Sequence, residues 1–289
     1  MKILIIGGDG RMTYLADTLV TMGNDVKIYA TPPSESELPV CEDLDAHLPT
    51  VDTVILPLPV SRDGIFINTP YSNEKIELSR IFSRLGQKKT ILAGKVSPAI
   101  KNQANQFSLR VFDYYEHESF TDENAYITAE GALYIAMENL VLAVRDSHHL
   151  IIGSGRIAKH LFLLLRGMGA RVTIVCRNIH DILWASALRA DVVDLAGESE
   201  ALEGAFATCD VIYNTVPERV IPHSCYSCAK KSALYIELVG DEKLAEDAKK
   251  SGCKCICAPA LPIRYAPESA SRLLAYAVCD VIGKRVMTK

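Results

Sequence analysis

A glycine-rich turn near the middle of the chain constrains its fold most strongly. Residues 150–158 read LIIGSGRIA, in which an apolar run meets Gly153, Gly155 and Ala158 at the spacing Gly-x-Gly-x-x-Ala. The first glycine of such a turn permits a tight bend, the second lets a pyrophosphate approach the backbone, and the small third residue lets helix and strand pack closely. The following helix offers N–H groups and the positive end of its dipole. We therefore predict a dinucleotide site, with these cofactor-binding residues: Gly153, Ser154, Gly155, Arg156 and Ile157.

The strand after this turn indicates which dinucleotide binds. It ends in Cys176, Arg177 and Asn178, where an NAD site usually carries Asp or Glu for the ribose hydroxyls. An arginine pairs with a 2′-phosphate, which an acid would repel. The sequence therefore predicts NADP (NADPH) as the cofactor, with Arg177 and Asn178 as ligands. The alternative interpretation of Arg177 is a solvated charge at the end of a strand.

The fourth strand of the same half ends in the sequence NTVP. Its residues Thr215, Val216 and Pro217 directly follow Asn214. In dinucleotide folds the turn after this strand flanks the ribose and the nicotinamide. We predict that Thr215, Val216 and Pro217 contact the cofactor.

The first ten residues, MKILIIGGDG, look like a second glycine turn, but they suit a nucleotide less well. The spacing from Gly8 and Gly10 demands a small residue where the chain has Thr13, and the next strand ends in KIYATPP without an acidic ribose ligand. Arg11 adds a cation to the first turn of the following helix, a combination that suits a small anion such as a carboxylate. We expect the middle turn to hold the dinucleotide and the first turn, with Arg11, to face the substrate.

Apolar runs alternate with helical patterns along the whole chain, which indicates βαβ units and largely parallel sheets. We predict an α/β fold with two Rossmann-like doubly wound domains joined by a long helix, and a C-terminal helix, from about Pro267 to Arg285, that returns to the first domain. The first domain is expected to comprise residues 1–127 with parts of 128–145 and 266–289. The NADP-binding domain is expected to comprise residues 146–265.

Candidate substrate ligands follow the strands of the first half, because ligands of open α/β sheets bind beyond the carboxyl ends of the strands. Ser61 and Arg62 follow VILPLPV, and Lys95 follows TILAG. Together with Arg11, these side chains suit a small substrate with more than one carboxylate. Lys95 is a candidate for binding an anion or for moving a proton. A solvated loop lysine is the alternative interpretation.

Thr128 and Glu130 stand where we expect the long inter-domain helix to begin, in TAEGALYIAMENLVLAVRD. A threonine followed by an early glutamate is typical of a capped helix N-terminus. A helix start beside a cleft would also offer both side chains to a ligand. We therefore predict Thr128 as a substrate ligand and Glu130, like Lys95, as a candidate catalytic residue.

The composition argues against several classes of protein. A net charge of −4 and the absence of a long Lys/Arg run give no reason to expect nucleic acid as a partner. MKILII is too short for a signal peptide, and the apolar stretch ALYIAMENLVLAV is interrupted by Glu138 and Asn139 and falls short of a membrane span. We expect a cytoplasmic protein that does not enter a membrane.

The nine cysteines are expected to be free thiols, because the sequence shows no export signal. Cys225-x-x-Cys228 and the CKCIC run at residues 253–257 raise the question of zinc. No histidine or second C-x-x-C pair lies at zinc-finger spacing. We predict no metal site.

Five motifs together resemble the A subunit of dipicolinate synthase from spore-forming bacteria. They are IIGGDGR at the start, ITAEGAL before the middle helix, the GSGRIA turn, NTVP, and CAPALPIRYAPESAS near the end. Their order and spacing run the whole length of the chain. The resemblance implies a fold like that of the two-domain hydroxyacid and alanine dehydrogenases.

The resemblance also implies a reaction and a partner. The family makes pyridine-2,6-dicarboxylate (dipicolinate), the calcium-chelating acid of spores, in the mother cell during sporulation. Its starting compound is a cyclic dicarboxylate of the lysine pathway, hydroxytetrahydrodipicolinate, which loses water and two hydrogens, with NADP as hydride acceptor. In this family the protein works with a second, flavoprotein-like B subunit.

Two other functions are compatible with the sequence. One is a 2-hydroxyacid or amino-acid-type NADP dehydrogenase, but a hydroxyacid enzyme needs a histidine near the end of the dinucleotide domain, and residues 257–265 contain none. The other is a non-catalytic NADP(H)-binding protein, since fold does not fix function. The sequence leaves open the identity of the base, whether the chain is active without its partner, whether it forms a homo-oligomer, and whether hydride goes to NADP or to a partner flavin.

Overall fold

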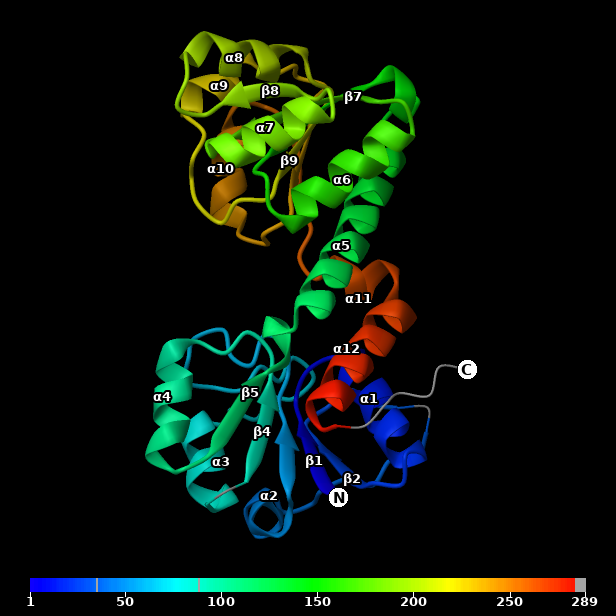
Figure 1. The fold of residues 1–289 in the computed structure, drawn as a ribbon, viewed down its shortest axis with the longest axis vertical. Coiled ribbons are helices and arrows are strands. Elements are labelled where there is room, and N and C mark those ends of the chain that lie inside the picture. The colour runs from blue at the N-terminus through cyan, green and yellow to red at the C-terminus, as the bar shows by residue number, and fades with distance from the viewer. Residues whose placement is uncertain (35, 88, 284–289) are drawn as a thin grey trace. The chain divides into compact units, whose positions relative to one another are not determined.

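Two parallel β-sheets organise the chain in the computed structural model, which describes residues 1–34, 36–87 and 89–283 (Figure 1). Each sheet forms the centre of its own compact unit. Unit 1 comprises Met1–Asn124 and the C-terminal segment from Ala266, and unit 2 comprises Ala125–Tyr265.

The sheet of unit 1 has five strands in the order β2-β1-β3-β4-β5, all parallel. Its strands are β1 (Lys2–Ile6), β2 (Asp25–Tyr29), β3 (Thr53–Ile55), β4 (Thr90–Ala93) and β5 (Arg110–Asp113). Parallel strands are buried on both faces. This explains why runs such as KILII and TILA are apolar almost throughout.

One face of this sheet is covered by three helices. They are α2 (Leu44–His47), α3 (Leu78–Leu85) and α4 (Pro98–Gln106), with short 3-10 turns at Leu48–Thr50 and Tyr114–Glu116 elsewhere in the unit. In α3 the buried residues are Leu78, Ile81, Phe82 and Leu85. This i, i+3, i+4, i+7 stripe is what an amphipathic helix presents to a core.

The other face of the sheet is covered by α1 (Gly10–Thr21) and α12 (Pro267–Val281), which lie side by side (Figure 1). Met12 and Leu15 of α1 share one core with Leu274 and Val278 of α12. The C-terminal helix therefore returns to the first domain, as the sequence predicts. The expected end of this helix near Arg285 lies outside the described residues.

The sheet of unit 2 has six strands in the order β11-β10-β9-β6-β7-β8, again all parallel. Its strands are β6 (His148–Ile152), β7 (Arg171–Cys176), β8 (Asp191–Asp194), β9 (Val211–Asn214), β10 (Leu234–Glu237) and β11 (Lys254–Cys257). Counted along the unit, this is the strand order of Rossmann domains, whose ligands bind where the order reverses. In unit 2 that point lies between β6 and β9.

Helices also cover both faces of the second sheet. They are α6 (Arg156–Gly167), α7 (Ile179–Ala187), α8 (Ser199–Thr208), α9 (His223–Cys228), α10 (Glu246–Lys250) and α11 (Leu261–Tyr265), with 3-10 turns at Val144–Asp146 and Glu242–Ala245. Leu161 and Phe162 of α6 pack in the core of one face, and Phe206 of α8 packs in the core of the other. The prediction of two doubly wound parallel-sheet domains is confirmed.

The long helix α5 (Glu118–Asn139) runs from unit 1 into unit 2. The predicted start at Thr128 is wrong, because the helix begins ten residues earlier and Thr128 lies inside it. No proline or glycine interrupts residues 118–127, and Glu118 in the first turn opposes the positive end of the helix dipole. Thr128 and Glu130 therefore do not form a helix N-terminus.

Among the described residues, no helix combines the length and apolar character that a membrane span requires.

Candidate functional site

The glycine turn of unit 2 lies at the carboxyl edge of its sheet, between β6 and α6. Gly153 adopts a φ of 106°, which side-chain-bearing residues rarely adopt. A Cβ atom at this position would collide with the Thr215 hydroxyl and would lie 2.8 Å from Cγ2 of Val216. The Thr215 hydroxyl donates to the carbonyl of Ile152 at 2.8 Å. The predicted turns 153–157 and 215–217 are thus in direct contact where the strand order reverses.

Gly155 is a glycine for a different reason. Its φ is −70°, which any residue tolerates, and no atom lies within 4 Å of the position that a Cβ would take. The space in front of its backbone is open, as an approaching pyrophosphate requires. Ala158, one turn into α6, is 1 % exposed, so its small size lets the helix pack closely against the sheet.

The N-terminus of α6 has no side-chain cap, because its N-cap residue is Gly155. An uncapped helix start leaves N–H groups and the positive dipole end to water or to a ligand. α6 is 12 residues long. The turn therefore combines room, N–H donors and positive potential, and these residues fit the pyrophosphate of a dinucleotide.

The end of β7 places Arg177 and Asn178 at the same edge of the sheet. Arg177 is exposed, and within the described ranges its guanidinium forms no ion pair or hydrogen bond. Asn178 is the N-cap of α7, and its Oδ1 accepts from the N–H of His180. The structure thus assigns Asn178 a capping role that the sequence prediction did not include.

Asp181 is an acid beside the glycine turn that the sequence prediction missed. Its carboxylate accepts from the Ser154 hydroxyl at 2.8 Å and lies 3.1 Å from Nζ of Lys159. Partial burial works to raise the pKa of Asp181, but the bonds from Ser154 and Lys159 outweigh it and lower the pKa. The ionised carboxylate is therefore paired with a cation at this edge of the site.

The first glycine turn has its donors satisfied within the chain. The N–H of Gly7 donates to the carbonyl of Tyr29 and that of Gly8 to the carbonyl of Asn68. A Cβ on Gly7 would lie 2.9 Å from the same Asn68 oxygen. The helix that follows, α1, is capped by the Asp9 carboxylate, which accepts from the Arg11 N–H. At Gly7 and Gly8 this turn therefore lacks room, and its helix start is capped by a carboxylate, unlike the turn in unit 2.

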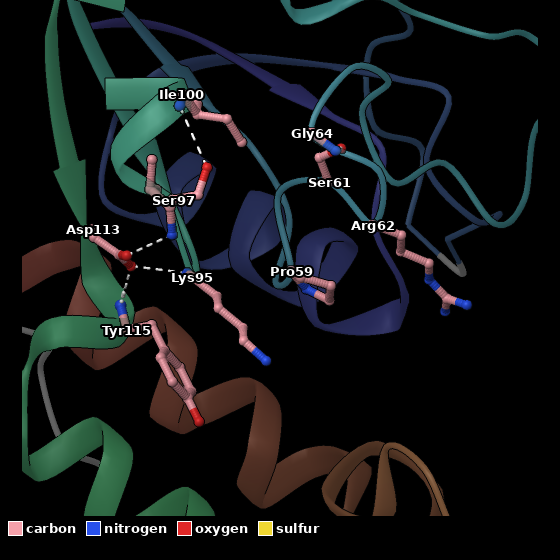
Figure 2. A pocket seen from close by; sticks show the side chains of 10 residues that line it. Pro59, Ser61, Arg62, Gly64, Lys95, Ser97, Ile100, Asp113 and Tyr115 are labelled. Carbon is pink, nitrogen blue, oxygen red and sulfur yellow. Dashed lines mark hydrogen bonds between the residues drawn. The ribbon is translucent and has the colours of Figure 1, made fainter. Parts of the chain in front are cut away.

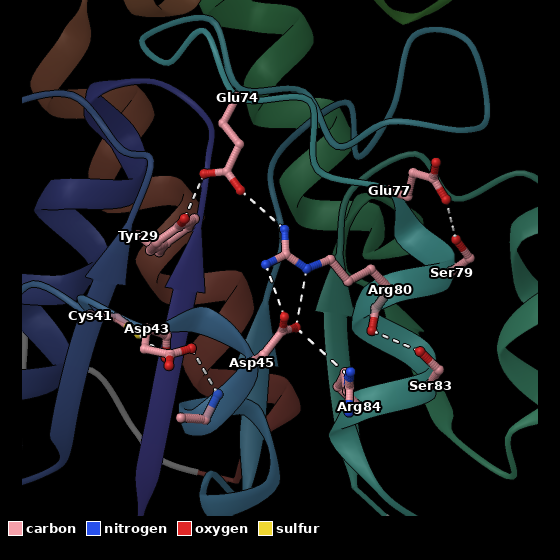
Figure 3. A network of polar contacts seen from close by, with 11 residues as sticks. Tyr29, Cys41, Asp43, Asp45, Glu74, Glu77, Ser79, Arg80, Ser83 and Arg84 are labelled. Carbon is pink, nitrogen blue, oxygen red and sulfur yellow. Dashed lines mark hydrogen bonds and ion pairs between the residues drawn. The ribbon is translucent and has the colours of Figure 1, made fainter.

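A polar network joins the segment around Glu74 to β2, α2 and α3 (Figure 3). Glu74 accepts from the Tyr29 hydroxyl at the end of β2 and from Nη1 of Arg80 on α3. Arg80 also donates twice to Asp45 of α2, at 3.1 Å each. Such half-exposed pairs contribute only about 0–1 kcal/mol each. Their combined effect is to fix the loop around Asn68 over the turn.

Arg11 has an intramolecular role in the structure. Its guanidinium donates to both oxygens of Asp9, at 2.9 and 2.8 Å, and to the carbonyl of Leu58 at 3.3 Å. The residue is only 8 % exposed and is not among those that line the cavity of unit 1. A paired, desolvated guanidinium stabilises the fold here and is a poor ligand for a free carboxylate.

A cavity of about 610 Å³ lies at the carboxyl edge of the unit 1 sheet (Figure 2). Three predicted substrate or catalytic residues line it, namely Ser61, Arg62 and Lys95, and Tyr115 lines it as well. Lys95 and Tyr115 extend from one side of the cavity, and Ser61 and Arg62 come from the loop on the other side. In the part of the chain that the structure describes, no carboxylate pairs with Lys95 or Arg62. Two unpaired cations around one cavity suit an anionic ligand.

Asp113 at the end of β5 shapes this cavity. Its carboxylate accepts from the backbone N–H groups of Lys95, Val96 and Tyr115, at 2.9, 2.6 and 2.9 Å. Lys95 itself adopts a φ of 59°, a left-handed conformation that is uncommon for a residue other than glycine. Asp113 therefore fixes the backbone at Lys95 and Tyr115, and this backbone orients their side chains. The sequence prediction missed this acid, whose only signal is its place directly before the pair Tyr114–Tyr115.

The remaining predicted residues of the first half take other places. The Ser61 hydroxyl donates to Asp63 and accepts from the N–H of Gly64, so its proton is already used. Thr128 is buried and Glu130 is exposed on α5 within unit 2, and neither lines the cavity of unit 1. Among the described residues, no group of three or more His, Cys, Asp or Glu side chains is arranged to hold a metal ion.

The fold and the glycine turn define a class of protein. The chain has the two-domain α/β fold of nicotinamide-dependent dehydrogenases, with a Rossmann unit 2. A D-lactate dehydrogenase from Treponema pallidum shares this fold with a TM-score of 0.60 at 12% identity, over 99% of this chain and 98% of that one.

Within this class the chain resembles the A subunit of dipicolinate synthase. Residues 2–115 match the family model of the N-terminal domain of that A subunit. The A subunit of dipicolinate synthase from Bacillus subtilis (strain 168) is 22% identical over 296 residues, which cover 98% of this chain and 96% of that protein. The crystal structure of its counterpart from Bacillus halodurans matches with a TM-score of 0.83 at 20% identity, over 98% of both chains. The resemblance indicated by the sequence motifs is confirmed.

The two glycines of the unit 2 turn predict opposite outcomes for the same substitution. Gly155→Ala should unfold at the wild-type temperature, within about 0.5 kcal/mol of stability, because its Cβ meets no atom. It should nevertheless bind a dinucleotide about tenfold or more weakly, since the methyl group fills the space for the pyrophosphate.

Gly153→Ala is the matched comparison. We expect it to lose about 1–3 kcal/mol of stability, because of its φ and the collision with Thr215. Thermal unfolding and calorimetric titration with NADPH measure both effects. Wild-type affinity in Gly155→Ala would show that the pyrophosphate does not pass this residue.

Proposed function

We propose that the chain is an NADP-dependent oxidoreductase that converts hydroxytetrahydrodipicolinate, a small cyclic dicarboxylate, to dipicolinate during sporulation. The observation that carries this proposal is the uncapped N-terminus of α6 behind the open space at Gly155, at the same sheet edge as the unpaired Arg177. The resemblance to the A subunit of dipicolinate synthase supports the substrate and the reaction.

The described residues fit the cofactor in three places. The turn of residues 153–157 takes the pyrophosphate, Arg177 and the Nδ2 of Asn178 take the 2′-phosphate of the ribose, and the turn 215–217 borders the nicotinamide half. When bound, NADP supplies the acceptor for a hydride. The chain itself binds and orients the dinucleotide.

Asp181 is the observation that would favour NAD instead, because an acid near the ribose repels a 2′-phosphate. Lys159 lies 3.1 Å from this carboxylate and offsets its charge. The unpaired charge of Arg177 then determines the sign of the potential at this end of the site. We therefore propose NADP as the cofactor.

The cavity of unit 1 is the proposed substrate site. Arg62 and Lys95 supply two cations, Tyr115 supplies a hydroxyl, and a cyclic dicarboxylate supplies two anions for them. Ser61 contributes by shaping the loop, since its proton is held by Asp63. Arg11 contributes through Asp9 and the carbonyl of Leu58 and is not proposed as a direct ligand.

Lys95 is the candidate catalytic residue that lines the cavity, and we propose that it contacts the substrate. As an ammonium it binds a carboxylate, and only its neutral amine form can take a proton from the ring. Glu130, exposed on α5, remains the alternative base. Loss of water and two hydrogens makes the ring aromatic, so the chain mainly has to position the ring and remove a proton. The proposed partner is a flavoprotein-like B subunit.

Binding of the reduced cofactors tests the NADP proposal. In calorimetric titrations the wild type should bind NADPH tightly and NADH about tenfold or more weakly, because a charged hydrogen bond to the 2′-phosphate contributes about 1.5–3 kcal/mol. Arg177→Ala should bring the NADPH affinity down to that of NADH.

The matched control is Arg166→Ala, which removes an exposed arginine at the far end of α6 and should leave the preference intact. A preference for NADH in the wild type would remove NADP from the proposal. No binding of either would favour a different role for unit 2.

The substrate site is tested by the binding of pyridine-2,6-dicarboxylate. Arg62→Ala and Lys95→Gln should each weaken binding by about tenfold or more, and the double variant should show none, since each cation loses one charged contact. Arg84→Ala, an exposed arginine on α3 that does not line the cavity, is the control. Equal affinities in the wild type, the two single variants and the double variant would place the substrate elsewhere.

A further inference from the structure

Glu237 is a buried carboxylate at the C-terminal end of β10, in the half of the sheet that lies beyond the strand-order reversal. It is 0 % exposed. Its Oε2 accepts from Nδ2 of Asn214 at 2.7 Å and from the Tyr235 hydroxyl at 3.1 Å, and its Oε1 accepts from the N–H of Val239 at 2.9 Å. Neither the cofactor nor the substrate residues above include it.

The partners of Glu237 complement its ionised form. An amide N–H and a backbone N–H donate to it, and the Tyr235 hydroxyl, which also lies 3.5 Å from the Leu244 carbonyl, donates to it as well. A carboxamide would set its NH2 group against the Asn214 or the Val239 donor. The pKa of Glu237 is raised, because burial disfavours its charged form and outweighs the opposing bonds from Asn214, Val239 and Tyr235. In the described part of the chain no lysine or arginine pairs with it. When Glu237 is ionised, its negative charge is held by hydrogen bonds and is not neutralised by a cation.

Asn214 connects this charge to the dinucleotide turn. Besides donating to Glu237, its side chain donates to the carbonyl of Val216 at 3.0 Å and accepts from the N–H of Val216 at 3.2 Å. Val216 in turn lies against Gly153. Glu237 thus fixes the orientation of the Asn214 amide, and that amide fixes the turn that contacts the glycine loop.

We propose that Glu237 is a positioning residue that also places a fixed negative charge below the nicotinamide half of the site, so that the chain binds the oxidised dinucleotide in preference to the reduced one. This inference rests on the proposed dinucleotide function of unit 2. Rossmann domains consist of two mononucleotide-binding halves. Since the glycine turn and Arg177 mark the adenosine half, the carboxyl ends of β9, β10 and β11 mark the nicotinamide half.

The preference follows from charge. The oxidised nicotinamide ring carries a positive charge, and the reduced ring carries none. A carboxylate that is not neutralised attracts the first and leaves the second unaffected, and the attraction is strong where water is excluded. For an enzyme that oxidises its substrate, such a charge favours binding of the cofactor form that is used and release of the form that is made.

Calorimetric titrations of NADP+ and NADPH test this inference in the wild type, in Glu237→Gln and in Glu237→Asp. The wild type should bind NADP+ more tightly than NADPH. Glu237→Gln, which removes the charge, should lower the ratio of the two affinities by roughly three- to tenfold. Glu237→Asp keeps the charge and should retain the ratio even if both affinities fall because Asn214 is held less well. Glu246→Gln, an exposed glutamate of α10, is the control.

The outcomes separate the two proposals. If the wild type binds neither form, the dinucleotide function fails and this inference with it. If the wild type binds both but prefers NADPH, or if Glu237→Gln keeps the wild-type ratio, only the role of the charge is overturned. If Glu237→Asp loses the ratio as Glu237→Gln does, retaining the charge does not retain the preference, and the role of the charge is overturned. If Glu237→Gln does not fold, a wild type that binds NADPH more tightly than NADP+ still overturns the role of the charge.

Discussion

The capping of two helix starts, those of α1 and α6, distinguishes the two glycine turns of this protein. Both α1 and α6 follow the first strand of a sheet through a glycine turn. In unit 1 the Asp9 carboxylate caps α1, and the N–H groups of Gly7 and Gly8 donate to carbonyls of the chain. In unit 2 the N-cap of α6 is Gly155, which caps nothing. Of these two helix starts within the described residues, the start of α6 is the one without a side-chain cap, which suits an anionic ligand.

The proposed substrate site of unit 1 lies in the loops at its sheet edge and does not include the first glycine turn. The loop around Asn68 covers the turn, and the network of Tyr29, Glu74, Arg80 and Asp45 holds that loop in place. The loops after β3 and β4 then form the cavity that carries Arg62 and Lys95. The same topology, with different local acceptors, carries the proposed site for a small anion in one unit and the proposed site for a dinucleotide in the other.

Much of the architecture could be predicted from the sequence, because apolar periodicity and glycine spacing are local signals. The two sheets, the middle turn at Gly153 and the return of the last helix are confirmed. Side-chain partners are less predictable. The pairing of Arg11 with Asp9 competes with ligand binding. The sequence alone does not distinguish an arginine that pairs within the chain from one that binds an anionic ligand. The start of α5 was missed because the polar residues before Thr128 include no proline or glycine, and such a segment can continue a helix or form a loop.

Buried polar groups were the least visible in the sequence. Glu237 follows an apolar strand and reads as an exposed strand-end acid, whereas its partner Asn214 lies on the neighbouring strand and shows that the carboxylate is buried. Asp113 is similar, since its role depends on two N–H groups that the loop at Lys95 brings to it and on the N–H of Tyr115. Such residues follow from the fold and not from any motif.

Hydrogen exchange on the single protein, with and without NADPH, tests the central claim most directly, because the two glycine turns serve as controls for each other. The account predicts that NADPH slows amide exchange in residues 153–158 and in the 214–217 turn and leaves residues 7–12 unchanged. Protection of residues 7–12 by NADPH, with no change at residues 153–158, would contradict it.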